Sequence, residues 1–206
     1  MKQRKNGGVT PANVMIFPMR VTRQLGDWPE KGERNARLAE CAGIVRRLLG
    51  GERVTHHGRV TVVEAEIHSR PATPPPLLGA AVTEATAGLV GGWADGLLTV
   101  SGEPEQVRRV VEAFRRGGGE GKRLVLQAGL SWAPTEDEAL HIAHDQWRGN
   151  VFAPPVCWDL ETVEHFDEVG EDVPPERVRD SVLVSSDLVQ HAAWLHELAR
   201  AEHAKA

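Results

Sequence analysis

The spacing of hydrophobic positions predicts a long helix at the start of the patterned region. Asp27 and Glu30 form a capping pattern with Pro29 at an early helical position, and Gly50-Gly51 ends the run. The apolar residues inside this segment recur at spacings of three and four: Leu38, Cys41, Val45 and Leu48. Next, Val54–Ile67 is broken at His57-Gly58, and its apolar residues Val63, Ala65 and Ile67 alternate with polar ones, which predicts a β-hairpin.

Three strand–helix units follow a proline-rich connector, Arg70–Pro76. The predicted strands are Leu77–Ala81, Leu97–Val100 and Arg123–Trp132. The predicted helices begin at Thr83, Pro104 and Thr135, and the second carries Val107, Val110, Val111 and Phe114 on one face. Strands that alternate with helices predict an α/β fold with parallel strands and crossover helices.

The pattern is weaker after Trp147. Val182–Ser185 fits either a strand or the approach to a helix. Asp187 predicts the cap of a final helix, with Leu188, His191, Leu195 and Leu198 in register.

Composition limits the function classes. The 206-residue chain has 41% hydrophobic residues, a net charge of −5 and a sequence pI of about 6.0, which favours a folded protein without general affinity for nucleic acid. No apolar run approaches the roughly 18 residues of a membrane helix. Two cysteines form no disulfide framework, so a cytoplasmic location is expected.

Charge separates the first residues from the rest. Residues 1–26 hold five basic and no acidic side chains, together with Gly7-Gly8, Pro11 and Pro18. We interpret 1–26 as a disordered or non-native segment, 27–198 as the folded portion and 199–206 as a tail.

Ligands in parallel α/β folds meet the carboxyl ends of the strands, where helix N-termini offer free amides. Three loops qualify: Gly79–Glu84, Ser101–Glu105 and Trp132–Glu136. In the first loop, Gly79, Ala80 and Ala81 leave the backbone uncovered, and Thr83 places a hydroxyl at a helix start. These residues fit a phosphate held by amides and a hydroxyl, but the residues alone favour a close strand–helix contact with Thr83 as a cap.

Other candidate chemistry has less support. Imidazoles are supplied by His56-His57, by His141 and His144, which could share a helix face, and by His191 with His196. No zinc motif accompanies these histidines, so we expect no metal site. Cys41 is expected to be a buried, inert thiol, and no activating group stands near Cys157 in sequence. Trp132, at the end of a predicted strand, is as compatible with a ligand contact as with packing.

Several stretches resemble the luciferase-like monooxygenase superfamily, and within it bacterial FMN-type oxidoreductases that do not use the deazaflavin coenzyme. These are the residues from Trp28 to Cys41, Pro75-Pro-Leu-Leu-Gly-Ala-Ala81, Trp93-Ala-Asp-Gly-Leu-Leu-Thr-Val100 and Ala133-Pro-Thr-Glu-Asp-Glu-Ala-Leu140. The similarity extends roughly from Asp27 to Leu198.

The resemblance implies part of a (β/α)8 TIM barrel, the C-terminal half to two-thirds, with FMN at the carboxyl mouth; a deazaflavin is the alternative cofactor. It also implies cofactor-binding residues: Gly79, Ala80, Ala81, Thr83, Glu84 and Thr99. A complete barrel takes about 250 residues, so the catalytic side chains of the early strands are not identified.

Three functional hypotheses follow. The first is an FMN-dependent oxidoreductase that acts on an unknown small molecule. The second is a catalytically inactive, truncated remnant that acts through a partner or by self-association, including as a homodimer. The third is a metal-dependent enzyme that uses the histidines.

Overall fold

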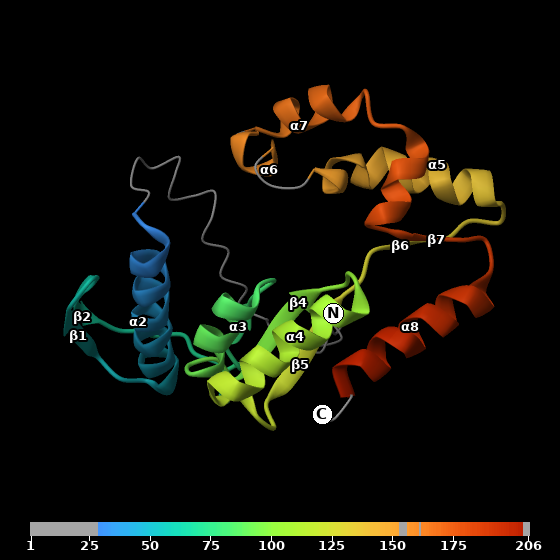
Figure 1. Cartoon of the computed structure of the whole chain (residues 1–206). Helices are drawn as coiled ribbons and strands as arrows, with labels where there is room; N and C mark the ends of the chain where they lie inside the picture. The colour runs from blue at the N-terminus through green and yellow to red at the C-terminus, as the bar shows by residue number, and fades with distance from the viewer. Residues whose placement is uncertain (1–28, 153–155, 161, 204–206) are drawn as a thin grey trace, which may run out of the picture. The chain divides into compact units, whose positions relative to one another are not determined.

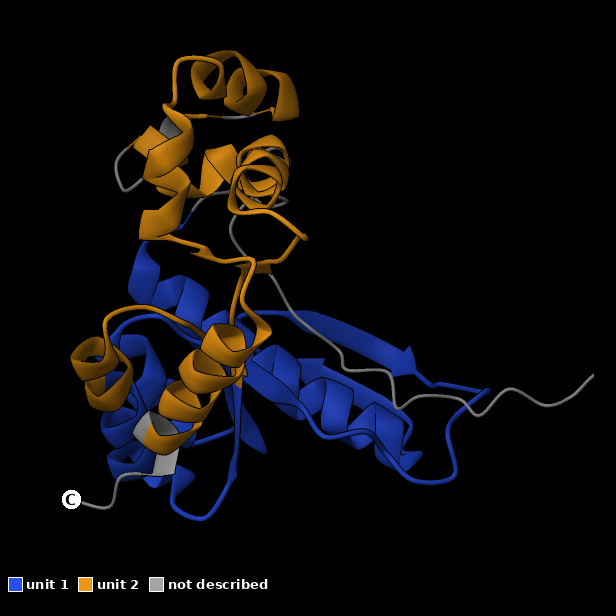
Figure 2. Cartoon of the chain, turned by 90° about the vertical axis from the view of Figure 1, so that its right-hand side faces the viewer, with its two compact units in different colours: residues 1–98, 110–125 blue, residues 99–109, 126–206 orange. Residues whose placement is uncertain are grey.

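The computed structural model describes residues 29–152, 156–160 and 162–203 (Figure 1). The predicted N-terminal segment 1–26 lies outside these residues. The chain divides into two compact units: Met1–Leu98 with Val110–Val125, and Thr99–Arg109 with Leu126–Ala206 (Figure 2). Each unit is described by itself. No helix in the described ranges is both long enough and apolar enough to cross a membrane.

The first unit contains the long helix, the hairpin and the first parallel strand pair. Its elements are α2 (Lys31–Gly50), β1 (Val54–His57), β2 (Thr61–Ala65), β3 (Leu78–Ala80), α3 (Glu84–Gly91), the start of β4 (Gly96–Val100), the last turn of α4 (Pro104–Phe114), η1 (Arg115–Gly119) and the start of β5 (Arg123–Gln127).

The predicted hairpin is confirmed. Strands β1 and β2 pair antiparallel, with Val54 opposite Ala65 and His57 opposite Thr61. Figure 1 shows the hairpin beside α2. Val54 is fully buried, so the hairpin contributes to the core of this unit.

The parallel strand pair that the sequence predicts after the proline-rich connector is also confirmed. Strand β3 pairs parallel with β4, with Leu78 opposite Gly96 and Ala80 opposite Leu98. In the three-stranded sheet, β4 lies between β3 and β5. The predicted apolar stripe of α4 is buried as expected: Val107, Val110, Val111 and Phe114.

Helix α3 and the π-helical turn η1 approach each other through glycines. A Cβ on Gly117 would overlap the carbonyl oxygen of Gly88, and one on Gly91 would overlap the carbonyl oxygen of Phe114. The Nζ of Lys122 donates to the Gly91 carbonyl at 2.7 Å. The glycines of α3 and η1 therefore allow close packing of two backbones.

The second unit is mainly helical around a short parallel strand pair. Its elements beyond the shared ones are β6 (Leu130–Ser131), α5 (Glu136–Trp147), η2 (Arg148–Val151), α6 (Val156–Asp159), α7 (Val163–Gly170), η3 (Pro175–Asp180), β7 (Leu183–Val184) and α8 (Leu188–His203). Strands β6 and β7 pair parallel. Its core comprises Ala133, Ala139, Ala143, Val178, Val182 and Val184.

The predicted single strand Arg123–Trp132 is wrong, because it divides into β5 and β6. Strand β5 ends at Gln127, and β6 pairs with β7 in another sheet. Ala128 and Gly129 connect the two, and the Gly129 carbonyl accepts a hydrogen bond from the Leu183 amide at 2.9 Å. A glycine that carries no side chain to pack is a weak point of a strand and allows the chain to change sheets.

Two helix predictions also need correction. Helix α2 begins at Lys31 with Glu30 as its N-cap and no side-chain cap, so Pro29 precedes the helix; the predicted cap, Asp27, lies outside the described residues. The predicted stripe of α8 is not a buried face, since Leu188 and Leu195 are exposed. Of the α8 side chains that the structure describes, only His191 is buried.

Candidate cofactor site

The loop after β3 joins a buried strand to an exposed helix start. Gly79 and Ala81 are buried, whereas Ala80 and the residues from Val82 to Glu84 are exposed. Of the three small residues predicted to leave the backbone uncovered, only Ala80 is exposed. A ligand at this end of the strand would meet the first turn of α3.

Part of the hydrogen-bonding capacity of this loop is used inside the protein. The Ala81 amide donates to the Leu98 carbonyl at 3.0 Å. The Thr83 hydroxyl accepts from the Thr86 amide at 3.4 Å and donates to the Thr86 hydroxyl at 3.0 Å. Thr83 is therefore the N-cap of α3, as predicted. The first-turn amides of an α-helix have no intrahelical acceptor, so the Ala85 amide can meet a ligand or water.

Close packing of α3 against β3 explains why residue 79 is a glycine. A Cβ there would overlap the side chain of Val90 and lie 3.2 Å from that of Ala94. The absence of a side chain lets α3 lie close against β3. A cofactor role for Gly79 is compatible with this contact but is not needed to explain the glycine.

The other two predicted cofactor residues differ in environment. Glu84 stands in the first turn of α3, where a carboxylate complements the helix dipole but repels a phosphate. Thr99 lies in β4, at the start of the second unit, and is 4% exposed. The cofactor-binding assignments of Gly79, Ala80, Ala81, Thr83, Glu84 and Thr99 stay predictions.

Asp95 anchors the start of β3 to the turn between α3 and β4. Its carboxylate accepts from the Leu77 amide at 2.8 Å and from Arg46 of α2 at 2.9 Å. Arg46 also donates to the Trp93 carbonyl at 3.0 Å. Burial pushes the pKa of Asp95 up, but the hydrogen bonds from Arg46 and Leu77 outweigh it and hold the pKa below its ordinary value.

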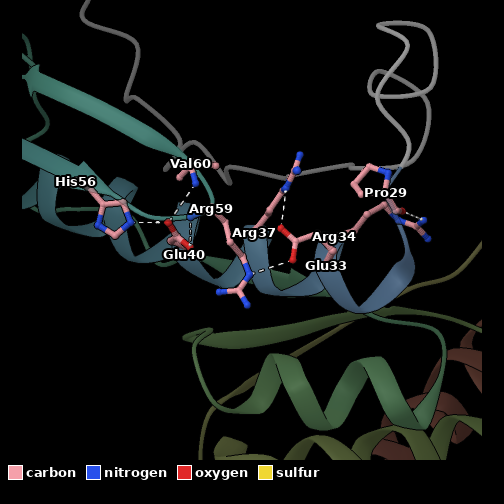
Figure 3. Close-up of polar contacts among 8 residues, drawn as sticks. All are labelled: Pro29, Glu33, Arg34, Arg37, Glu40, His56, Arg59 and Val60. Carbon is pink, nitrogen blue, oxygen red and sulfur yellow. Dashed lines mark hydrogen bonds and ion pairs between the residues drawn. The ribbon is translucent and has the colours of Figure 1, made fainter.

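Two carboxylates of α2 hold the tip of the hairpin (Figure 3). Glu40 accepts from Nε2 of His56 and from the amides of Val60 and Arg59, the amides at 3.2 and 3.3 Å. Nearer the start of α2, Glu33 accepts a hydrogen bond from the Arg59 guanidinium at 3.1 Å. The His56 hydrogen bond, followed by that of Val60, lowers the pKa of Glu40.

A polar cluster also closes the carboxyl ends of β6 and β7 in the second unit. Glu136 of α5 accepts from the Ser186 amide at 3.0 Å and pairs with Arg179 at 2.9 Å. The Trp132 indole donates to the Ser186 carbonyl at 3.0 Å. The Ser186 amide, followed by Arg179, lowers the pKa of Glu136.

The histidines considered as metal ligands have separate partners. His144 bonds to the Val173 carbonyl at 2.7 Å, His191 to the Ser185 carbonyl at 3.0 Å, and His56 to Glu40. Within the described part of the chain, no three His, Cys, Asp or Glu side chains come together as a metal would require. Cys41 is half-buried, and burial raises the pKa of its thiol.

Sequence reasoning missed the three carboxylate clusters centred on Asp95, Glu40 and Glu136. Their partners lie far away in the chain: Arg46 is 49 residues from Asp95, and Ser186 is 50 residues from Glu136. Local periodicity carries no such signal. The only hint was the Trp93-Ala-Asp-Gly stretch, which contains Asp95.

Comparison with known proteins identifies the family. The family model described as "Luciferase-like monooxygenase" matches residues 17–203, so the chain belongs to this family. It is 29% identical over 173 residues to the F420-dependent glucose-6-phosphate dehydrogenase of Nakamurella multipartita, covering 80% of this chain and 51% of that protein. The enzyme of the same name from Mycobacterium tuberculosis is 27% identical over 171 residues, with 79% and 51% covered. The chain thus spans about half the length of these curated relatives.

Solved structures show the same fold. An F420-dependent secondary alcohol dehydrogenase, in complex with an F420–acetone adduct, matches with a TM-score of 0.74 at 20% identity, over 89% of this chain and 58% of that one. A riboflavin lyase with modified FMN and riboflavin matches with a TM-score of 0.63 at 15% identity, over 93% and 56%. The predicted class is confirmed: the chain is an α/β protein that corresponds to about half of a TIM barrel.

Proposed function

We propose that this chain forms the cofactor-binding portion of a luciferase-like oxidoreductase that uses a flavin or a deazaflavin. The observation that carries the proposal is the family match over residues 17–203. The parallel β3–β4 pair supports it, because a small-residue loop and the start of α3 follow β3 at its carboxyl end.

The relatives help to choose between a deazaflavin and FMN as the cofactor. Those at 27–29% identity carry F420 in their names, whereas the FMN-containing riboflavin lyase shares only 15% identity. We therefore favour a deazaflavin and keep FMN, the cofactor of the sequence resemblance, as the second candidate. A bound cofactor of this type exchanges a hydride with a small-molecule substrate.

The role proposed for this chain is to bind and orient the cofactor. The first-turn amides of α3 fit a phosphate, since they point along the helix axis toward a negative charge. The Glu84 carboxylate repels a phosphate at this helix start, so removal of that carboxylate should strengthen cofactor binding through this loop. In this proposal the protein acts in the cytoplasm, as expected from its cysteine usage.

The first experiment is a titration of the purified chain with F420 and with FMN, followed by cofactor fluorescence and melting temperature. A ligand that binds the native state raises the melting temperature with concentration. The proposal fails for any cofactor that, at millimolar concentration, shifts neither quantity.

Thr83 and Thr135 provide a matched pair of variants. Both cap a helix with the same geometry: Thr83 accepts from Thr86, and Thr135 from Glu138 at 3.3 Å. Replacement by alanine should cost about 1 kcal/mol of stability in either case. Only Thr83→Ala should also weaken cofactor binding, and Thr83→Ser should restore it. Equal cofactor affinity in the two alanine variants would show that Thr83 caps α3 and does not bind the cofactor.

The inactive remnant is the second candidate function. It is favoured by the exposed apolar residues of α8. Such a protein would act through a partner or through self-association. Failure of both cofactors to bind, together with concentration-dependent association, would support it.

A further inference from the structure

Helix α3 is packed into the first unit by contacts near its carboxyl end. Gly79 of β3 leaves room for the Val90 side chain, and Gly91 lies against the Phe114 carbonyl. In contrast, the residues from Val82 to Ala85, which include the start of α3, are exposed. The position of the first turn of α3 is therefore set largely from the other end of the helix.

The glycine contact between α3 and η1 limits how closely the two backbones approach, but it does not fix how far α3 slides along its own axis. A Cβ on Gly117 would overlap the carbonyl oxygen of Gly88, so bare backbone meets bare backbone here. Helices normally resist sliding because side-chain ridges of one helix lie in the grooves of the other. Since glycines form no such ridges, a directional contact is needed to fix the axial position of α3.

Lys122 makes such a directional contact. Its Nζ donates to the carbonyl of Gly91, the last residue of α3, at 2.7 Å. The final carbonyls of a helix have no intrahelical donor and form the negative end of the helix dipole, so an ammonium group there is favourable on both counts. Gly91 is buried and Lys122 is half-buried, which makes this hydrogen bond stronger than it would be in water.

The backbone that carries Lys122 is fixed by a turn and a strand of the same unit. Gly118 and Gly121 have φ angles of +104° and +73°, which glycine adopts without steric cost. The Lys122 amide donates to the Gly119 carbonyl at 3.1 Å, and β5 begins at the next residue, Arg123. Lys122 therefore has a defined backbone from which its side chain reaches the end of α3.

We propose that Lys122 is a positioning residue, which sets the axial position of α3 and, through it, the affinity of the first-turn amides for the cofactor phosphate. The inference rests on the proposed function, in which this turn holds the phosphate. An eight-residue helix is about 12 Å long, and a rigid element of this length carries a shift at Gly91 to its first turn. Lys122 thus acts through α3 and does not touch the ligand.

Lys122→Met tests the inference, because it keeps an unbranched side chain and loses the ammonium group. Arg123→Met is the matched control, since it removes the same charge one residue later from an exposed position. The full-length chain is titrated with FMN and with riboflavin, which carries the same ring without a phosphate. Lys122→Met should weaken FMN binding about 2- to 10-fold and leave riboflavin binding unchanged. Lys122→Arg should restore the FMN affinity, and Arg123→Met should bind both molecules like the wild type.

Backbone amide resonances report the position of α3 without any ligand. In NMR spectra of the free chain, Lys122→Met should shift the amide resonances of Glu84 and Ala85, whereas Arg123→Met should not. Unchanged resonances, or an equal loss of FMN and riboflavin affinity, would overturn the positioning role. If the wild type binds FMN no more tightly than riboflavin, the proposed phosphate site fails for FMN, and the amide resonances still decide whether Lys122 positions α3.

Discussion

Gly117 marks a close approach of two backbones in the first unit. A Cβ at this position would overlap the Gly88 carbonyl of α3, and backbone cannot move aside as a flexible side chain can. We expect Gly117→Ala to destabilise the protein by about 1–3 kcal/mol, because α3 and η1 must separate. Urea unfolding followed by tryptophan fluorescence measures this change.

Gly43 is the matched control for that substitution. It lies in the middle of α2, is exposed, and has nothing within 4 Å of an added Cβ. Gly43→Ala should stabilise the chain by about 0.5–1 kcal/mol through helix propensity alone. If both variants shifted stability in the same direction, the close approach of α3 and η1 would not exist in solution.

The ion pair between Arg46 and Asp95 makes a second prediction at the residue scale. Asp95→Asn keeps an oxygen for the Leu77 amide but loses the charge, whereas Asp95→Ala loses both. We expect a cost of about 1 kcal/mol for Asp95→Asn and more for Asp95→Ala, since the pair is partly exposed. A double-mutant cycle with Arg46→Ala should give a coupling energy above zero. Strict additivity of the two substitutions would show that the pair contributes nothing.

At the scale of elements, the hairpin is attached to α2 through ionised carboxylates. The pKa of Glu40 is lowered from an ordinary value of 4.5, so its stabilising contribution is complete above that value and is lost as the pH falls through the lowered pKa. Glu33, whose pKa is lowered by Arg37 and then Arg59, changes stability in the same direction. The urea concentration at the midpoint of unfolding should therefore decrease as the pH is lowered from neutral to about 3.

Glu40→Gln tests this attachment. The amide keeps the shape of the side chain but loses the charge, so the midpoint should be lower at neutral pH and should fall less on acidification. Glu197→Gln removes an exposed carboxylate from α8 and should follow the wild-type curve. If Glu40→Gln and the wild type lost stability equally in acid, Glu40 would not hold the hairpin.

The elements that the sequence predicts well are those with local signals. Thr83 and Thr135 cap their helices as expected, and the alternating hairpin residues pair as expected, because each pattern reports contacts within a few residues. The single strand Arg123–Trp132 was wrong because β6 selects its partner, β7, more than 50 residues further along. Strand pairing at such a separation is decided by packing and leaves no periodicity to read.

The candidate functional residues also differ in whether a local sequence signal identifies them. The loop from Gly79 to Glu84 could be found from small residues followed by a cap. In contrast, the link from Trp132 through Ser186 to Glu136 joins two loops that only the parallel pairing of β6 and β7 brings together. Sequence alone could indicate Trp132 as a candidate but could not show that its polar edge is satisfied.

At the scale of the whole molecule, helix α8 carries several apolar side chains that are exposed among the residues the structure describes. Leu188, Val189 and Leu195 of α8 are all exposed. Burial of such side chains gains about 25 cal/mol per Å² of apolar surface. We therefore expect the chain to self-associate, with a weight-average mass in sedimentation that rises with concentration.

Helix α8 offers a matched pair of variants for this expectation. Leu195→Glu places a charge among the exposed apolar side chains and should shift the association to higher concentration. Gln190→Glu adds the same charge at an exposed position five residues away, which a helix turns by about 140°, and should leave it unchanged. A wild-type chain that sediments as a single monomer at every concentration and melts cooperatively would contradict self-association. Such a monomer does not need a second copy to cover α8. This result would favour the cofactor-binding proposal over the self-associating remnant.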